Sequence, residues 1–240
     1  YVCPAPCEIK CQLAQVADAP EAIRTLKRFV ADHASREWLH NREIPPTGKS
    51  VAIVGSGPAG LTAAYYLAMS GHRTTVIEML PQPGGMMRVG IPSYSLPRDI
   101  LDTEIEHIKK AGVELKSGTR VESLDPLFAQ GYDAAFLAVG AHRGVRMGIE
   151  GEDSPGVIDA LSFLRRVNLG ECPTMGKSVT IVGGGNSAVD ASRTALRLGA
   201  EEVTVVYRRT RAEMRAYPEE INQAIREGVN IVYLAAPSRI

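Results

Sequence analysis

What this sequence lacks narrows its class. None of its apolar runs approaches the roughly 20 residues of a membrane-spanning helix, and no signal peptide opens the chain, so we expect a cytoplasmic protein without membrane insertion. The 27 basic and 27 acidic residues balance, which gives no reason to expect nucleic acid or an anionic membrane as a partner. The 240 residues, 45% hydrophobic, suit one large or two ordinary domains. Because the chain starts with Tyr1 and stops just after a strand-like segment, we expect a fragment.

Familiar catalytic arrangements are also missing. We find no Ser/His/Asp set and no pair of carboxylates with an interpretable spacing. Cys172 has no second cysteine nearby, so the redox motif CxxC is absent and we interpret Cys172 as structural. Beyond two nucleotide-binding patterns, the sequence has no internal repeat and no low-complexity tract.

The first of those patterns organises the chain. A short apolar strand, Val51 to Val54, runs into a GxGxxG turn, and a small-residue helix follows from Leu61 to Met69. A second buried strand, Thr74 to Ile77, ends on Glu78. Strand, glycine turn, helix and a strand-end acid about 20 residues on form a complete dinucleotide-binding unit.

Each glycine of this turn has a separate task. Gly55 allows the tight turn, Gly57 lets a pyrophosphate approach the backbone, and Gly60 lets the helix pack close to the strand. The phosphates would lie against free N–H groups at the positive end of the helix. Glu78 can accept both hydroxyls of an adenosine ribose and repels a 2′-phosphate. We therefore expect FAD or NAD here, and not NADP.

The same order of strand, glycine turn, helix and strand occurs a second time, but different residues follow its second strand. The strand Ser178 to Val182 leads into Gly183, Gly184, Gly185, Asn186 and Ser187, a helix covers Val189 to Leu198, and a strand covers Val203 to Tyr207. No acid follows this strand. Arg208, Arg209 and Arg215 stand there instead, and guanidinium groups can bind a 2′-phosphate with paired hydrogen bonds. The second unit is predicted to bind NADP, unless RRTRAEMR is only a solvated surface turn.

Three cysteines open the chain. Cys3, Cys7 and Cys11 stand four residues apart in a loop that Pro4 and Pro6 keep from forming a regular helix. Without a secretory signal, such a set indicates a metal before a disulfide. The spacing suits an iron–sulfur cluster better than a zinc knuckle, although zinc and plain thiols stay open. The loop supplies three ligands where a cluster needs four.

The other segments alternate between helices and strands. A helix from Ala19 to Trp38, with Asp18 as its N-cap and Pro20 in its first turn, is expected to tie the cysteine loop to the rest. Met86, Met87 and Val89 lie between two turns and suit either an aromatic ring or an ordinary core. The remaining expected elements are helices at 97–111 and 158–167, short strands at 113–115 and around Val121, a buried strand at 132–139, and a strand at 229–234.

With these motifs, the chain resembles the flavin-containing small subunit of glutamate synthase and its relatives, which include ferredoxin:NADP oxidoreductase large subunits and the amino-terminal half of dihydropyrimidine dehydrogenase. The resemblance covers nearly the whole chain, through CPAPCEIKC, VAIVGSGPAGLTAAYYLA, VGIP, FLAVGAH, IVGGGNSAVD and the arginine-rich segment up to Glu220. It implies that the first unit binds FAD, the second NADPH, and the cysteines a [4Fe–4S] cluster. The implied FAD contacts are Gly55, Ser56, Gly57, Pro58, Ala59, Gly60, Glu78, Met79, Gln82, Gly85, Met86, Val121 and Gly140.

The sequence thus predicts an α/β fold with two Rossmann-like dinucleotide-binding units, preceded by a small helical iron–sulfur segment. We expect this segment at 1–44, the FAD unit at 45–143 and the NADP unit at 144–240. The expected function is hydride transfer between NADPH and FAD, with electrons passing through the cluster to a redox partner subunit in a hetero-oligomer. NADH is an alternative donor, and a flavin and iron–sulfur wiring subunit without nucleotide oxidation is an alternative function. The cofactors carry this chemistry, so we name no catalytic residue.

Overall fold

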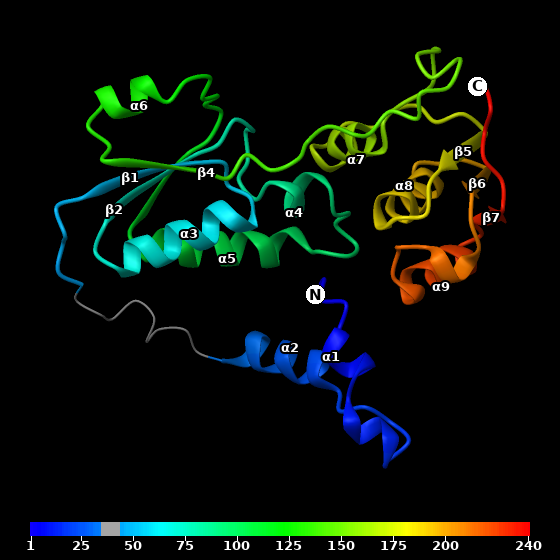
Figure 1. Ribbon diagram of the computed structural model, residues 1–240, viewed down its shortest axis with the longest axis horizontal. Helices are drawn as coiled ribbons and strands as arrows, with labels where there is room; N and C mark the ends of the chain where they lie inside the picture. The colour runs from blue at the N-terminus through cyan, green and yellow to red at the C-terminus, as the bar shows by residue number, and fades with distance from the viewer. Residues whose placement is uncertain (35–43) are drawn as a thin grey trace.

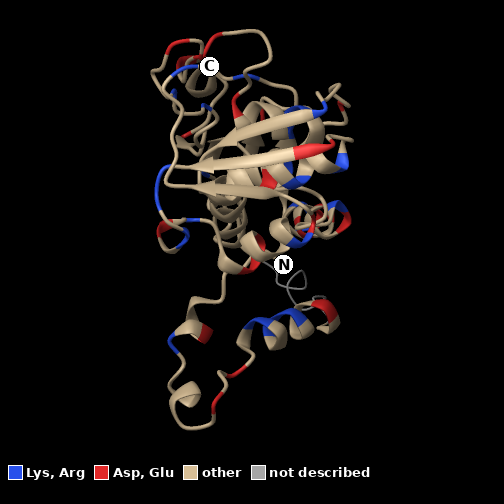
Figure 2. Cartoon of the chain, turned by 90° about the vertical axis from the view of Figure 1, so that its right-hand side faces the viewer, with Lys and Arg blue, Asp and Glu red and all other residues tan. Residues whose placement is uncertain are grey.

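A computed structural model describes residues 1–34 and 44–240 (Figure 1). Two separate parallel sheets, each with its own helices, make up most of the described chain. A small helical segment at the N-terminus lies outside both sheets (Figures 1 and 2) and contacts the second unit through an ion pair of 3.4 Å between Arg24 and Glu219. No helix in the described ranges is long and apolar enough to cross a membrane. The predicted α/β fold with two nucleotide-type units is confirmed.

The first unit is built on a four-stranded parallel sheet in the order β3-β2-β1-β4. Its elements are β1 (Ser50–Val54), α3 (Pro58–Met69), β2 (Arg73–Ile77), α4 (Met86–Val89), α5 (Arg98–Lys110), β3 (Val113–Lys116), α6 (Asp125–Ala129) and β4 (Ala134–Leu137). Alternate residues of β1 face opposite sides. Val51 and Ile53 pack with α3, while Ala52 and Val54 pack with Leu127 of α6. This double coverage explains why β1 is a continuous apolar run.

The second unit has a three-stranded parallel sheet in the order β5-β6-β7. Its elements are α7 (Ala160–Asn168), β5 (Ser178–Val182), α8 (Asn186–Arg197), β6 (Glu202–Tyr207), η3 (Arg211–Glu213), α9 (Pro218–Arg226) and β7 (Asn230–Tyr233). Val203 and Val205 are buried in a core with residues of α8 and α9. On the other face Val182 and Val232 are about 40% exposed, so the predicted full burial of β5 is wrong.

The N-terminal segment holds α1 (Pro6–Ile9), η1 (Gln12–Gln15) and α2 (Ile23–His33). The predicted start of α2 is wrong, because its N-cap is Ala22 and both Asp18 and Pro20 precede it. Apolar side chains of α2 are largely exposed, Phe29 by 60%. The end of the expected helix, including Trp38, lies outside the described residues.

Two expectations about the first unit need correction. Val121 lies in a loop and not in a strand, although its side chain packs against the core beneath α6. β4 returns the chain to the first sheet as expected and pairs with β1, but it is shorter than predicted and is not buried, with Leu137 59% exposed. It forms the edge of the sheet, where it pairs with β1 alone among the described strands. The expected helices α5 and α7 and strands β3 and β7 are confirmed within one to two residues.

Candidate dinucleotide-binding sites

The first glycine turn follows β1 at the carboxyl edge of the sheet. Gly55 has a φ of 106°, and a Cβ there would lie 2.3 Å from the Ala138 carbonyl oxygen. A Cβ on Gly60 would lie 1.9 Å from the Gly55 carbonyl oxygen, so α3 approaches β1 only because this residue is glycine. A Cβ on Gly57 would meet nothing within 4 Å. The turn therefore packs tightly at two glycines and opens outward at the third.

That opening suits an anion. Gly57 is the N-cap of α3 and Pro58 is its first residue, and no side chain caps this end. Leu61 is the first residue whose N–H bonds back into the helix, so the N–H groups of Ala59 and Gly60 find no acceptor within the described chain. Free N–H groups and the helix dipole favour negative charge at this point. The space above Gly57 thus fits a pyrophosphate.

Glu78, which follows β2, lies against the first glycine turn. It is only 4% exposed, and its Oε2 accepts hydrogen bonds from the backbone N–H of Ser56, at 2.8 Å, and from the Ser56 hydroxyl. Its Oε1 accepts one from the Leu80 N–H at 2.8 Å. The strand-end acid is therefore fastened to the glycine turn. Its remaining lone pairs are the acceptors available for ribose hydroxyls.

The segment after Glu78 returns to the turn. Gly85 has a φ of 52°, and a Cβ there would lie 2.6 Å from the Gly57 Cα, so its backbone lies directly against the turn. Gly84 also donates its N–H to the Ser56 carbonyl at 3.1 Å. Met86 opens α4 right after this contact, whereas the sequence had suggested a loop. Gly85 and Met86 are thus beside the predicted pyrophosphate site, and Met79 lies 41% exposed nearby in the chain.

Arg88 holds this segment in place. No sequence motif predicted this role. Its side chain is 5% exposed, donates to the Pro83 carbonyl and pairs with Asp102. It also donates to the Gln82 side chain at 3.4 Å. The one sequence feature that could have indicated a buried arginine is its position as a single cation within the otherwise apolar run MMRV. Arg88 holds the predicted FAD-contacting loop in place.

His142 is a second residue that the sequence did not single out. It follows Gly140, whose Cβ position lies 3.7 Å from the His142 Nε2. Its Nδ1 is buried without a hydrogen-bond partner, as is the Nε of Arg165, which donates through its Nη2 to the His142 carbonyl at 2.9 Å. Burial and the Arg165 guanidinium lower the pKa of His142. In the described chain this Nδ1 is therefore an unsatisfied buried polar atom in the loop that follows β4.

The second turn repeats the geometry of the first. Gly183 has a φ of 142°, and a Cβ on Gly184 would lie 2.5 Å from the Tyr207 ring. A Cβ on Gly185, the N-cap of α8, would meet nothing within 4 Å, as at Gly57. The N–H groups of Asn186 and Ser187 find no acceptor in the described chain. Gly185 is therefore the open position, and a phosphate would fit beside it as at Gly57.

The arginines meet at this cradle. A cavity of ≈ 240 Å³ is lined by Gly184, Gly185, Tyr207, Arg208, Arg209 and Arg215. Two hydrogen bonds to the Gly184 carbonyl, from the N–H groups of Arg215 and Ala216, bring the distant Arg215 back to the turn. Among the described residues, no carboxylate lines the cavity, and Glu213 approaches Arg209 only to 3.9 Å. Three cations around one small cavity fit a phosphate better than they fit a solvated surface turn.

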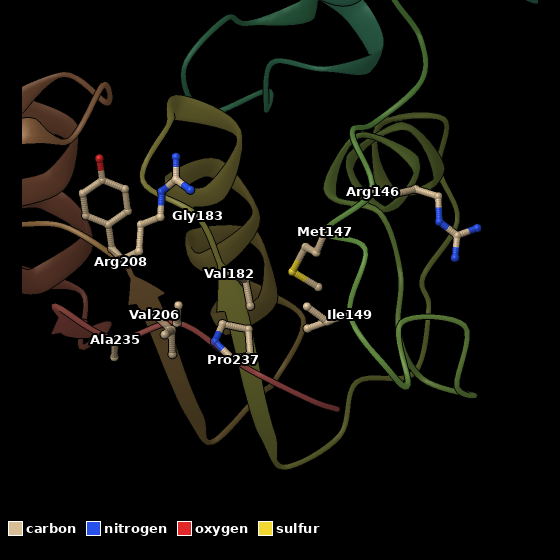
Figure 3. A pocket seen from close by; sticks show the side chains of 11 residues that line it. Arg146, Met147, Ile149, Val182, Gly183, Val206, Arg208, Ala235 and Pro237 are labelled. Atoms are coloured by element: carbon tan, nitrogen blue, oxygen red, sulfur yellow. The ribbon is translucent and has the colours of Figure 1, made fainter.

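A larger cavity of ≈ 380 Å³ adjoins the first along Tyr207 and Arg208. Its wall is mostly apolar and comes from three segments: the ends of β5 and β6, the crossing from the first unit with Met147 and Ile149, and residues 235–237 after β7. Figure 3 shows these side chains facing a common space, with Arg146 turned outward. No local sequence motif predicts this cavity, because its walls lie far apart along the chain.

The cysteines are not assembled into a site. Cys3 and Cys7 are exposed and Cys11 is partly buried, and Cys7 lies within the single turn of α1. Backbone hydrogen bonds, first that of Glu21, lower the pKa of the Cys11 thiol. In residues 1–34 and 44–240, no group of three or more His, Cys, Asp or Glu side chains is placed to hold a metal ion. The cluster ligands remain a prediction. Cys172, interpreted as structural, is a free and exposed thiol.

Comparison with known proteins decides the family. The family model of the pyridine nucleotide-disulphide oxidoreductases matches residues 49–237. The chain belongs to this family. The match begins just before β1 and ends after β7, so this oxidoreductase family accounts for both glycine turns and both sheets.

The chain spans only part of the length of the relatives that it matches. It is 46% identical over 268 residues to the NADP(+)-dependent formate dehydrogenase subunit beta of Moorella thermoacetica, covering 100% of this chain and 38% of that protein. It is 35% identical over 254 residues to the glutamate synthase (NADPH) small chain of Escherichia coli K12, covering 98% of this chain and 53% of that protein. The expected resemblance to the glutamate synthase small subunit group is confirmed.

A solved structure shares the fold. FprA of Mycobacterium tuberculosis in complex with NADPH superposes with a TM-score of 0.65 at 21% sequence identity, over 80% of this chain and 60% of FprA. This similarity supports the two-unit architecture of the family member.

Proposed function

We propose that this chain is the nucleotide-binding part of an electron-transfer oxidoreductase subunit, with FAD on the first glycine turn and NADPH on the second. The cavity lined by three arginines carries the proposal, because it joins a phosphate cradle to a cation cluster at the end of β6. The names of the relatives support it, since a formate dehydrogenase subunit and a glutamate synthase chain are both named for NADP(+) or NADPH. NADH stays the alternative donor.

The assignment of FAD to the first unit rests on charge. Glu78 is a buried carboxylate at the end of β2, where it would repel a 2′-phosphate and accept ribose hydroxyls. The second unit has Arg208 and Arg209 at the matching place, after β6. The two turns are therefore built for different nucleotides. We propose that residues 45–143 and 144–240 are the FAD and NADP units.

The residues of both turns would bind and orient the cofactors. The N–H groups of Ala59, Gly60, Asn186 and Ser187 would receive the pyrophosphates, and Arg208, Arg209 and Arg215 the 2′-phosphate. The flavin, when bound, supplies the chemistry: it accepts a hydride from NADPH and gives up electrons one at a time. No side-chain acid or base is needed, and the protein contributes alignment.

The cysteine segment would take the electrons onward. We propose that Cys3, Cys7 and Cys11 ligate a [4Fe–4S] cluster together with a fourth ligand from elsewhere, and that a redox partner subunit exchanges electrons with it. The beta-subunit and small-chain names of the relatives support a hetero-oligomer. The three thiols are accessible to varying degrees and none is in a disulfide.

Charge reversal of Arg208 and Arg209 tests the proposal. In the double variant Arg208→Glu, Arg209→Glu, we expect NADP⁺ affinity to fall by at least about 100-fold, because two charge-assisted hydrogen bonds of about 1.5–3 kcal/mol each are lost. NAD⁺ affinity should change little. Arg211→Glu is the matched control, since Arg211 lies in the same segment but bonds to Asn222 and does not line the cavity. Titration of each variant with both nucleotides measures the effect. Unchanged NADP⁺ binding in the double variant would refute the second site.

A further inference from the structure

A set of side-chain contacts joins the two units at a place away from both glycine turns. Tyr94 belongs to the segment between α4 and α5 of the first unit, and its ring lies against α8 of the second. The guanidinium carbons of Arg193 and Arg197 are 4.5 and 4.2 Å from the ring centroid. The Tyr94 hydroxyl donates to the Asp190 carbonyl at 3.4 Å. One aromatic side chain of the first unit thus meets three successive turns of α8.

The Glu227 carboxylate accepts hydrogen bonds from both arginines and so holds their side chains in place. It follows α9 and accepts from Arg193 Nε and Nη2 at 3.0 and 2.7 Å, and from Arg197 Nη1 and Nη2 at 2.7 and 2.9 Å. These hydrogen bonds, that of Arg197 first, lower the pKa of Glu227 to about 2, so the carboxylate is charged at neutral pH. Each guanidinium is held by two bonds to one carboxylate. The surface that receives the Tyr94 ring is therefore pre-arranged.

Further hydrogen bonds fasten the same region. Asn168 at the end of α7 donates to the Val89 carbonyl at 3.0 Å and accepts from Arg98 Nη2 at 2.9 Å. Arg98 in turn donates to the Met87 carbonyl at 3.0 Å. α4 starts directly after Gly85, which touches the first turn, and α8 starts directly after Gly185 in the second. In Figure 1, α4 lies between the helices of the first unit and α7.

We propose that Tyr94 is a positioning residue, which holds the first unit against α8 and so keeps the two glycine turns in one mutual orientation. In the described chain the hydrogen bond and cation–π contacts of Tyr94 are all with residues of α8 and none is with either turn, so it acts through α8. Its consequence for hydride transfer rests on the proposed function. Transfer requires the reacting atoms to approach closely, and a displacement of about 1 Å can cost about 100-fold in rate.

Tyr94→Ala and Tyr94→Phe separate the ring from the hydroxyl. In the full-length protein with FAD bound, we expect Tyr94→Ala to slow flavin reduction by NADPH at least about 10-fold, while FAD content and NADP⁺ affinity stay within about 2-fold of wild type. Tyr94→Phe keeps the ring against the arginines and should behave as wild type. Hydrogen exchange, followed by mass spectrometry, should become faster in 86–97 and 160–168 for Tyr94→Ala only.

Each outcome decides the proposal. Wild-type reduction and exchange in Tyr94→Ala would overturn it, and so would a rate loss matched by equal losses of FAD and NADP⁺ binding, because that indicates general destabilisation. Should Tyr94→Ala fail to fold, Arg197→Met serves, since this half-exposed side chain keeps its aliphatic stem and loses one cation. We expect a rate loss of about 2- to 5-fold there, and no loss would count against the proposal. If NADPH does not reduce wild type, the proposed function fails, while the exchange data still judge the contact.

Discussion

Replacement of Gly57 by alanine should separate cofactor binding from folding. The backbone at Gly57 has φ −70° and ψ −178°, an extended conformation that alanine adopts freely. The added Cβ meets no protein atom within 4 Å. We therefore expect the apoprotein of Gly57→Ala to be as stable as wild type or more stable by about 0.4–1 kcal/mol, because alanine restricts the unfolded chain.

FAD binding should respond in the opposite direction. The methyl group occupies the space through which a pyrophosphate would reach the N–H groups of Ala59 and Gly60. Loss of one charge-assisted hydrogen bond costs about 1.5–3 kcal/mol, or about 10- to 100-fold in FAD affinity. Gly60→Ala is the contrasting variant, since its Cβ would lie 1.9 Å from the Gly55 carbonyl oxygen. That variant should lose about 1–3 kcal/mol of stability through overpacking.

Two measurements on the apoprotein check this pair. Urea unfolding gives the free energy of unfolding, and quenching of FAD fluorescence on binding gives the dissociation constant. The reasoning would be refuted if Gly57→Ala bound FAD like wild type, since the pyrophosphate would then lie elsewhere. It would also be refuted if Gly57→Ala were destabilised as much as Gly60→Ala.

Two further predictions concern the second unit. Gly185→Ala, whose Cβ also meets nothing within 4 Å, should weaken NADP⁺ binding by about 10- to 100-fold and leave FAD binding unchanged; equal NADP⁺ affinity would argue against this cradle. Burial first, and then Glu220, raise the pKa of Asp190 to about 7 from an ordinary 3.8, so its neutral form stabilises the fold below pH 4 and this contribution, at most about 4 kcal/mol, is lost as the pH rises through 7. Asp190→Asn cannot titrate, so its unfolding free energy relative to wild type should improve between pH 4 and 8 in urea titrations; a difference that does not vary with pH would contradict this.

The sequence was sufficient for the local parts of both sites. A glycine turn between an apolar strand and a small-residue helix is a pattern within 30 residues, so β1, α3, β5 and α8 were located within a few residues. The strand-end charges, Glu78 against Arg208 and Arg209, follow directly from each strand. Arg215 was expected beside these arginines because its segment lies close to them in the chain, and it lines the same cavity.

Contacts between residues far apart in the chain could not be predicted from the sequence. Tyr94 meets Arg193 across 99 positions, and nothing in either local segment signals the partner. Burial of β4 was overestimated because its apolar run does not reveal that it forms a sheet edge. The larger cavity, with walls from Met147 to Pro237, depends on the same kind of contact. The start of α2 was misjudged because Asp18 and Pro20 resemble a cap that the helix does not use.

An anaerobic titration of the full-length protein, with NADPH and separately with NADH, tests the central claim most directly. The visible spectrum follows the flavin and any iron–sulfur absorbance together. The account predicts that NADPH bleaches the flavin at lower concentration than NADH, and that iron–sulfur absorbance falls in step. A flavin that neither nucleotide reduces would contradict it and would leave the chain a wiring subunit, with Arg208, Arg209 and Arg215 as a surface turn.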